Sequence, residues 1–414
     1  MKRMQRSTFL TTAAGMAAAL TAAAPAPAQN LTPAPSPAPG APAPAATLPP
    51  ALPNAGKRAG RTALVLSGGG ARGAYEAGII CALADKSGLK DGQPLPYDFV
   101  CGTSIGGMNA YMTATAQYTR MKTLWETVAQ YGVANLKSPY NKIKDPRAGN
   151  IAKARAAIAL GKGAFTDVAG LLDPSGVWKL LDIVAQTSDP VHIPLYIAAT
   201  NITRVQGEIF LRRANTPEGL VKQAINDQIL TNYKRTPIRD MTDEYLHKAL
   251  FGSAAMPVAF DPIMIPPAWG GPPEAYVDGG VTHNVPIGVA RRCCENLNVI
   301  LVDPPQRQYA FPIRNVIEIA LGSFATMQAQ LFETQVRLAY AESAVAGLVA
   351  RTTSSSADAA DDIPLQVGYL RPAAELPGGA MNFSDGPSLK KSFDVGYEDG
   401  TKGWQTFVPH GLTN

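Results

Sequence analysis

The sequence Thr62-Ala-Leu-Val-Leu-Ser67 is followed directly by Gly68-Gly69-Gly70-Ala71-Arg72-Gly73. A short apolar run that ends at glycines is typical of a buried parallel strand. The next residues, Ala74 to Lys86, carry apolar side chains at helical spacing, which predicts a helix. A strand, a tight turn and a helix in this order predict the first unit of an α/β fold.

The rest of the chain repeats this alternation. A second strand is expected over Tyr97–Cys101 and a second helix from about Ile105, and residues 112–190 are expected to form several helices. Further strands are expected at 193–199, 208–211, 275–277 and 297–302. A long helical pattern covers 316–349, and a last strand and a final helix are expected at 363–371 and 388–397. We therefore predict one α/β domain over residues 61–405, with a central, mostly parallel sheet and helices on both faces.

The first 60 residues have a different composition. A basic start, MKRMQR, precedes an uncharged, Ala-rich stretch and the small-residue sequence Ala26-Pro27-Ala28. This pattern indicates a signal peptide over residues 1–28, cleaved near Ala28, and hence an exported protein, periplasmic or secreted; an uncleaved anchor is the alternative. The Pro/Ala-rich residues 29–60 are expected to be a disordered linker, and residues 406–414 a C-terminal tail.

Charge and cysteine content exclude several classes of function. The formal net charge is +5, but Lys2, Arg3 and Arg6 all lie in the first six residues, so the body is close to neutral. No Lys/Arg run marks a nucleic-acid site, and we expect no nucleic-acid partner. The four cysteines, Cys81, Cys101, Cys293 and Cys294, have no metal-ligand spacing, so we expect buried thiols and no metal site.

The glycine cluster at residues 68–73 leaves two interpretations open. It satisfies G-x-G-x-x-G between a strand and a helix, which is the dinucleotide-binding fingerprint. That fingerprint also needs an acidic residue at the end of the next strand, where this chain has Val100-Cys101-Gly102-Thr103-Ser104 instead. Three consecutive glycines alternatively form a loop whose backbone N–H groups can face an oxyanion.

A second motif, Gly102-Thr103-Ser104-Ile105-Gly106, fits the G-x-S-x-G nucleophile elbow. The serine of such an elbow lies on a sharp turn between strand and helix, and glycines two residues before and after it let neighbouring backbone pass. Ser104 would then stand at a helix N-terminus, where the peptide dipoles favour developing negative charge. The pattern predicts that Ser104 is a nucleophile.

Two candidates remain for the base that activates Ser104. His410 with Asp303 would complete a triad of the Ser…Asp…His order, although nothing near either residue marks it. Asp278, at a predicted strand end before Gly279 and Gly280, could accept the proton directly if burial raised its pKa. His283 is expected to be structural or to line the rim of the site.

The order of GGGARG (68–73), GTSIGG (102–107) and DGG (278–280) resembles that of the patatin-like phospholipase family. Pro194–Thr200 and Gly252–Pro262 are similar to two further segments of that family, and the resemblance covers about Arg61 to Asp303 well and continues more loosely to about Tyr397. It implies a three-layer α/β fold, Ser104 as nucleophile, Asp278 as base, and an oxyanion hole from the loop with Gly68, Gly69, Gly70 and Arg72. Gly73, Gly102, Gly106, Gly279 and Gly280 would support these motifs. Many members have Asp where this chain has Ser67, which leaves a hole made by backbone unaffected.

The function expected from the resemblance is a serine acyl hydrolase, of phospholipase A type, that cleaves fatty-acyl esters of lipids through an acyl-enzyme without any cofactor. Its expected partners are a lipid or acyl-ester substrate and, peripherally, a membrane surface. A Ser–Asp–His esterase and a dinucleotide-binding oxidoreductase are the alternatives that the residues leave open.

Overall fold

The structure is a computed structural model, and it describes residues 59–138, 141–145, 147–163, 170–231, 233, 235–305 and 365–406, together with parts of 322–341. The chain divides into two compact units, Met1–Ala51 and Leu52–Asn414, and the described residues all belong to the second. The predicted signal peptide, the linker up to residue 58, residues 407–414 and His410 lie outside the described residues.

The central sheet has ten strands, most of which lie in the order β10-β9-β8-β1-β2-β3-β4-β5. Strands β9, β8, β1, β2 and β3 are parallel, whereas β4 and β7 run antiparallel to β3. The strand bounds are β1 Thr62–Leu66, β2 Phe99–Thr103, β3 Leu195–Asn201, β4 Gln206–Arg212, β5 Ile238–Asp240, β6 Ile263–Ile265, β7 Glu274–Asp278, β8 Asn296–Ile300, β9 Gln366–Leu370 and β10 Gln405–Thr406.

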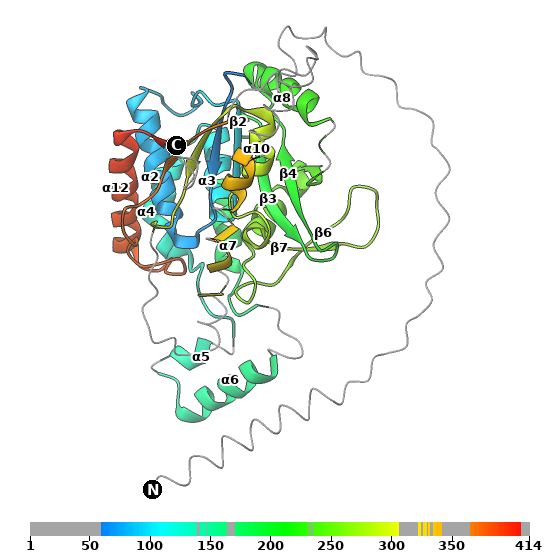
Figure 1. Cartoon of the computed structure of the whole chain (residues 1–414). Helices are drawn as coiled ribbons and strands as arrows, with labels where there is room; N and C mark the ends of the chain where they lie inside the picture. Colours follow the sequence, from blue (N-terminus) through cyan, green and yellow to red (C-terminus); the bar gives the residue numbers. More distant parts are fainter. Residues whose placement is uncertain are drawn as a thin grey trace, which may run out of the picture. The chain divides into compact units, whose positions relative to one another are not determined.

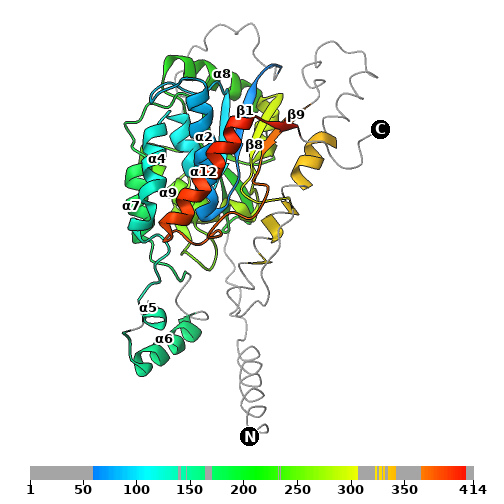
Figure 2. The ribbon, with the colours of Figure 1, turned by 90° about the vertical axis from the view of Figure 1, so that its left-hand side faces the viewer.

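The helices cover both faces of this sheet, because successive strand residues point to opposite sides. In β1, Leu64 and Leu66 face one apolar core, while Ala63 and Val65 face the other. The first core is covered by α2, α3, α4, α7, α9 and α12, and the second by α8 and α10 (Figures 1 and 2). The helix bounds are α2 Gly73–Lys86, α3 Ile105–Ala114, α4 Tyr118–Thr127, α5 Asn141–Lys144, α6 Asn150–Gly163, α7 Ser175–Val184, α8 Pro217–Leu230, α9 Leu246–Ala254, α10 Ile287–Cys293 and α12 Gly386–Lys402.

The predicted fold class is confirmed, with corrections to single elements. Strand β2 begins and ends two residues later than expected, because Gly102 and Thr103 still pair with Leu66 and Ala198 on its two neighbours. Helices α8, α9 and α10 and strands β5 and β6 were not expected. The described parts of the 316–349 pattern are helical, and the strand expected at 363–371 is β9. All four cysteines are buried free thiols, as predicted.

Candidate active site

Two strands that run toward each other along β3 bring Ser104 and Asp278 together. Strand β2 runs parallel to β3 and ends with Thr103 opposite Ala198, so that Ser104 follows at once. Strand β7 runs antiparallel along the same β3 and ends with Asp278 opposite Ala199. Because the carboxyl ends of β2 and β7 meet at adjacent positions of β3, residues 174 positions apart in the chain become neighbours.

Ser104 lies in a strained backbone turn that the surrounding structure holds. Its φ of 57° and ψ of −128° are unusual for a residue with a Cβ. A Cβ at Gly106 would lie 2.4 Å from the carbonyl oxygen of Ser67, so only glycine allows β1 and the start of α3 to approach this closely. At Gly106, neighbouring backbone therefore passes close to the elbow, as expected for a glycine that flanks Ser104.

A buried serine, Ser253 in α9, fixes the backbone of the elbow. The Ser253 hydroxyl accepts a hydrogen bond from the Ser104 N–H at 2.8 Å and donates one to the carbonyl of Ala198 at 2.6 Å. The Ser104 N–H is therefore occupied, and the hydroxyl of Ser104 is the group left to react. Sequence reasoning missed this role, although Gly252-Ser253 lies within a segment already singled out for its resemblance.

Asp278 is buried, and its carboxyl group faces Ser104. It accepts a hydrogen bond from the backbone N–H of Gly280 at 2.7 Å. Burial is the largest influence and raises the pKa of Asp278 to about 6, while the neighbouring Ser104 hydroxyl and the Gly280 N–H lower it. A Cβ at Gly279 would lie 2.2 Å from the carbonyl oxygen of Ala198, which explains the glycine after Asp278.

The glycine loop offers fewer backbone donors than the sequence suggested. The N–H of Gly68 donates to the carbonyl of Asn284 at 3.0 Å, and that of Arg72 donates to Gly69 at 3.4 Å. Within the described part of the chain, no hydrogen bond is recorded for the N–H groups of Gly69 and Gly70. Of the four residues expected to form an oxyanion hole, Gly68 and Arg72 therefore already use their N–H groups, and Gly69 and Gly70 are the candidates left among the described residues.

Arg72 is buried and forms ion pairs rather than facing open space. Its guanidinium contacts Asp303, which follows β8, and lies 3.5 Å from Glu375. These pairs hold the glycine loop against the segments after β8 and β9. Asp303, the acid of the alternative triad, is also engaged by Arg72.

Comparison with known proteins identifies the family. A model of the family described as patatin-like phospholipase matches residues 64–291, more than half of the chain. The chain belongs to the patatin-like phospholipase family. Family membership makes it a lipid-hydrolysing enzyme, and the match includes all three glycine motifs.

Other comparisons add little to this. A solved structure of VipD from Legionella pneumophila has 15% identity and a TM-score of 0.32, over 84% of this chain and 68% of that one. Among curated proteins, a search with the sequence finds no match.

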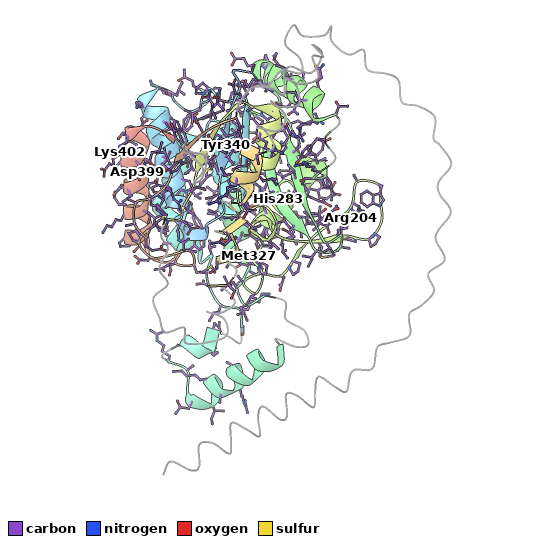
Figure 3. The ribbon with its side chains drawn as sticks, viewed as in Figure 1. Arg204, His283, Met327, Tyr340, Asp399 and Lys402 are labelled. Carbon is purple, nitrogen blue, oxygen red and sulfur yellow. The ribbon has the colours of Figure 1, made fainter. Side chains whose placement is uncertain are left out.

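In the described part of this patatin-like chain, the side chains of His247 and His283 have other partners than Ser104. The backbone carbonyl of His283 accepts a hydrogen bond from Thr103 at 2.6 Å, but its ring contacts Thr282 and the backbone of Gly207. Burial lowers the pKa of His283 and of His192. The ring Nε2 of His247 forms a hydrogen bond with the backbone carbonyl of Ala185. Among the described histidines, none is recorded as hydrogen-bonded to Ser104; Figure 3 places His283 within the sheet region.

A buried polar cluster behind the elbow was also missed by sequence reasoning. Glu76 of α2 accepts a hydrogen bond from Asn109 of α3 at 3.0 Å, and the same amide donates to the carbonyl of Gly73. Burial raises the pKa of Glu76 to about 8. The signal was present, since Glu76 is an acid inside an otherwise apolar helix.

Neither metal sites nor membrane spans are found in the residues that the structure describes. No group of three metal-ligating side chains occurs there, and no helix there is both long and apolar enough to cross a bilayer.

Proposed function

We propose that this patatin-like chain hydrolyses acyl esters of lipids with Ser104 as nucleophile and Asp278 as the only side-chain base. The observation that carries the proposal is that the ends of β2 and β7 place Ser104 beside a buried carboxyl group whose pKa burial raises to about 6. An ordinary aspartate is too weak a base for a hydroxyl, and this shift brings Asp278 closer to the pH at which it must act.

In the proposed mechanism, the Ser104 oxygen attacks the acyl carbonyl while its proton passes to Asp278. The N–H groups of Gly69 and Gly70 then hold the oxyanion, aided by the N-terminal end of α2, which follows the loop. Collapse expels the alcohol, which takes the proton from Asp278 and leaves Ser104 acylated. Asp278 next removes a proton from water, the resulting hydroxide attacks the acyl-enzyme, and the acid leaves as Ser104 regains its proton.

The base and the oxyanion donors can be ranked by their expected contributions to the rate. A positioned base contributes about 10²–10⁴-fold to the rate, and each oxyanion donor contributes roughly 10²–10³-fold. We therefore expect Asp278→Asn to lower kcat/KM for an ester by about 10²–10⁴-fold while the fold is kept.

The test is labelling with a fluorophosphonate, followed by mapping of the modified residue and by assays on a panel of acyl esters. Labelling should occur at Ser104 alone and should be lost in Ser104→Ala. The matched comparison is Asp278→Asn against His410→Ala, because the triad alternative uses the histidine. Loss of activity in His410→Ala with activity kept in Asp278→Asn would replace the proposed base. The dinucleotide alternative is disfavoured by family membership, and it predicts binding of a nicotinamide or flavin dinucleotide and no labelling.

We also propose export of the protein, supported by the basic start, the Ala-rich stretch and the small residues at 26–28. The N-terminal sequence of protein recovered from a cell envelope or culture medium should begin near Gln29. Recovery of unprocessed protein from the cytosol would contradict this proposal.

A further inference from the structure

The sheet continues beyond the level of the Ser104–Asp278 pair as a small antiparallel extension. It consists of the β3–β4 hairpin, whose turn is residues 202–205, and of β6 and β7 with the loop 266–273 between them. Figure 1 shows β6, β7 and the hairpin on the side of the sheet away from α12. Two strand residues separate Ala199, opposite Asp278, from the turn, so the tip lies about 10 Å beyond the pair of residues at about 3.3 Å per residue.

Large apolar side chains are exposed at the end of this extension. Val205 is 89% exposed, Trp269 66%, Met264 48% and Ile202 45%. Ile202 donates its N–H to Ala275, and Met264 is the register partner of Ala275 on the other side. Ile202, Ala275 and Met264 therefore lie in one row across three strands, and side chains in one row point to the same face. We call Ile202, Val205, Met264 and Trp269 the apolar tip.

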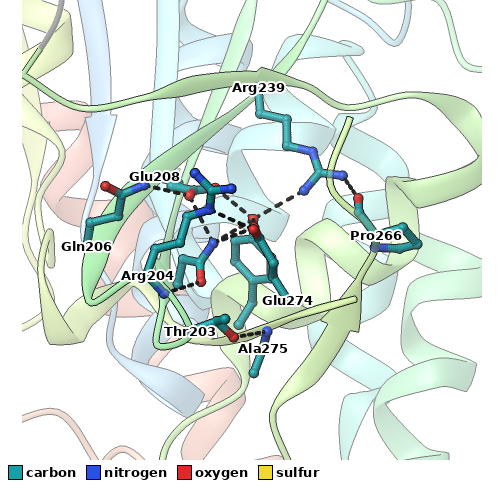
Figure 4. A network of polar contacts seen from close by, with 10 residues as sticks. Thr203, Arg204, Gln206, Glu208, Arg239, Pro266, Glu274 and Ala275 are labelled. Atoms are coloured by element: carbon teal, nitrogen blue, oxygen red, sulfur yellow. Dashed lines mark hydrogen bonds and ion pairs between the residues drawn. The ribbon is translucent and has the colours of Figure 1, made fainter. Parts of the chain in front are cut away.

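Next to the apolar tip, polar residues of the two hairpins form a network of hydrogen bonds and ion pairs (Figure 4). Arg204 stacks on Trp269, 4.0 Å from the ring centre, and pairs with Glu274 at 2.6 Å. Asn201 donates to Glu208 and Glu274, and Thr203 accepts the N–H of Ala275. Burial alone would raise the pKa of Glu274, but the hydrogen bonds from Arg204 and Asn201 outweigh it and lower that pKa, so the pair stays charged. Figure 3 shows Arg204 on the side opposite Asp399 and Lys402 of α12.

Val205, at the end of the tip, has a strained backbone conformation that lowers the stability of the folded chain. It has a φ of 55°, a conformation that a β-branched residue rarely adopts. Among the described residues, none buries this side chain, which is 89% exposed. Asparagine or glycine would fit this turn with less strain. An apolar, strained residue at the end of a rigid hairpin is explained by a partner outside the chain.

The chemistry of the tip points to a lipid surface as that partner. Residues 263–273 contain no charged residue, and the charges of Arg204 are matched by Glu274. Tryptophan next to a paired arginine suits the border between water and hydrocarbon. The polar zone of a bilayer is roughly 5–8 Å thick on each side, so a tip that protrudes about 10 Å would place Ser104 near the lipid head groups.

We propose that the apolar tip docks the enzyme on the surface of a lipid bilayer, through apolar insertion rather than charge. The choice of lipid as the partner rests on the proposed function. The docking itself does not need catalysis, so it can be measured in a protein whose Ser104 is replaced.

The first experiment measures binding of the full chain carrying Ser104→Ala to phosphatidylcholine vesicles, by flotation and by tryptophan emission. Among the four tryptophans, Trp269 alone is exposed, so its emission should shift to the blue on binding. Adding Trp269→Ser should abolish the shift and weaken binding about tenfold or more, and Val205→Asn should weaken binding severalfold. Leu220→Ser is the control, because Leu220 is a large apolar residue that is 54% exposed on α8, away from the tip, and it should leave binding unchanged. Raising the salt concentration should have little effect.

The second experiment uses chains with Ser104 intact. Trp269→Ser should lower hydrolysis of vesicle phospholipid about tenfold and leave kcat/KM for a soluble short-chain ester unchanged. If the parent fails to cleave any ester, the proposed function fails, while the vesicle measurement still decides the docking. The docking proposal is overturned if the parent does not bind vesicles. It is also overturned if Trp269→Ser and Val205→Asn bind vesicles as strongly as the parent does. So does self-association of the parent that Trp269→Ser removes without any vesicle binding, since the tip would then join two copies of the chain.

Discussion

Ser104 and Val205 share almost the same unusual backbone angle, a φ of 57° and of 55°, in opposite surroundings. Ser104 is 8% exposed and is fixed by a strand, a helix, the Ser253 hydroxyl and glycines that pack against neighbouring backbone. Val205 is 89% exposed, and only the hairpin that contains it fixes its angle. In the first region the strain is imposed by many packed neighbours and places the Ser104 hydroxyl beside Asp278. In the second it is imposed by a turn and leaves an apolar side chain exposed.

A substitution should do the most damage where the elbow around Ser104 is packed most tightly. Gly106→Ala would put a Cβ 2.4 Å from the carbonyl oxygen of Ser67, and backbone on both sides would have to move. We expect destabilisation of roughly 1–3 kcal/mol and loss of most ester hydrolysis, measured by urea unfolding and by fluorophosphonate labelling. Gly149→Ala is the control, since a Cβ there meets nothing within 4 Å. An active, fully stable Gly106→Ala protein would show that the elbow tolerates movement.

Ser253→Ala removes one hydrogen-bond acceptor from the elbow instead of adding an atom. The buried Ser104 N–H and the Ala198 carbonyl would both lose their partner, at a cost of about 1–3 kcal/mol. We expect kcat/KM to fall about tenfold to a hundredfold with little change in KM, because the nucleophile shifts while the substrate site is kept. Ser67→Ala should have a much smaller effect, since its hydroxyl contact with Glu76 is long, at 3.5 Å. Equal losses in both variants would remove the special role of Ser253.

The pH dependence of the two regions should differ. Asp278 must be ionised to accept the proton of Ser104, and its pKa is raised to about 6. We expect kcat/KM for a soluble ester to be flat above this value and to fall about tenfold per pH unit below it. His283→Gln should leave the midpoint unchanged. Vesicle binding should be independent of pH over the same range, because no side chain of the apolar tip titrates. A midpoint near 4 would mean that Asp278 is solvated in the free enzyme.

The two regions also differ in how far the sequence predicts them. The order of motifs around Ser104 and Asp278 was enough to predict the α/β fold and to single out two residues that the fold brings together, because Gly102, Gly106 and Gly279 are required by backbone that passes close by. The sequence could not predict the hydrogen-bond partners of the Gly68 and Ser104 N–H groups. Those partners, the Asn284 carbonyl and the Ser253 hydroxyl, are brought close only by tertiary packing.

The apolar tip has no motif at all. Its loop, Pro266-Pro267-Ala-Trp269-Gly-Gly-Pro-Pro273, has a composition similar to that of the linker near the N-terminus, and nothing local distinguishes an anchored loop from a free one. What distinguishes it is Arg204, which comes from the other hairpin and stacks on Trp269. The exposure of the tip depends on pairing between β3, β6 and β7, and single-sequence patterns do not predict which strands pair.

Val205→Asn gives the smallest effect and separates the two kinds of strain most clearly. Asparagine adopts the left-handed backbone region more readily than valine, so this variant should be more stable than the parent by about 0.5–1 kcal/mol. It should also bind phosphatidylcholine vesicles less well, because an apolar side chain is lost from the tip. A gain in thermal stability together with a loss of binding cannot come from misfolding, which would lower both. Ser104→Asn should give no such gain in stability, because packed neighbours already fix the backbone angle at residue 104. That change would also remove the proposed nucleophile. If Val205→Asn proved less stable than the parent, valine would have a packing role within the hairpin, and its exposure would no longer point to a partner.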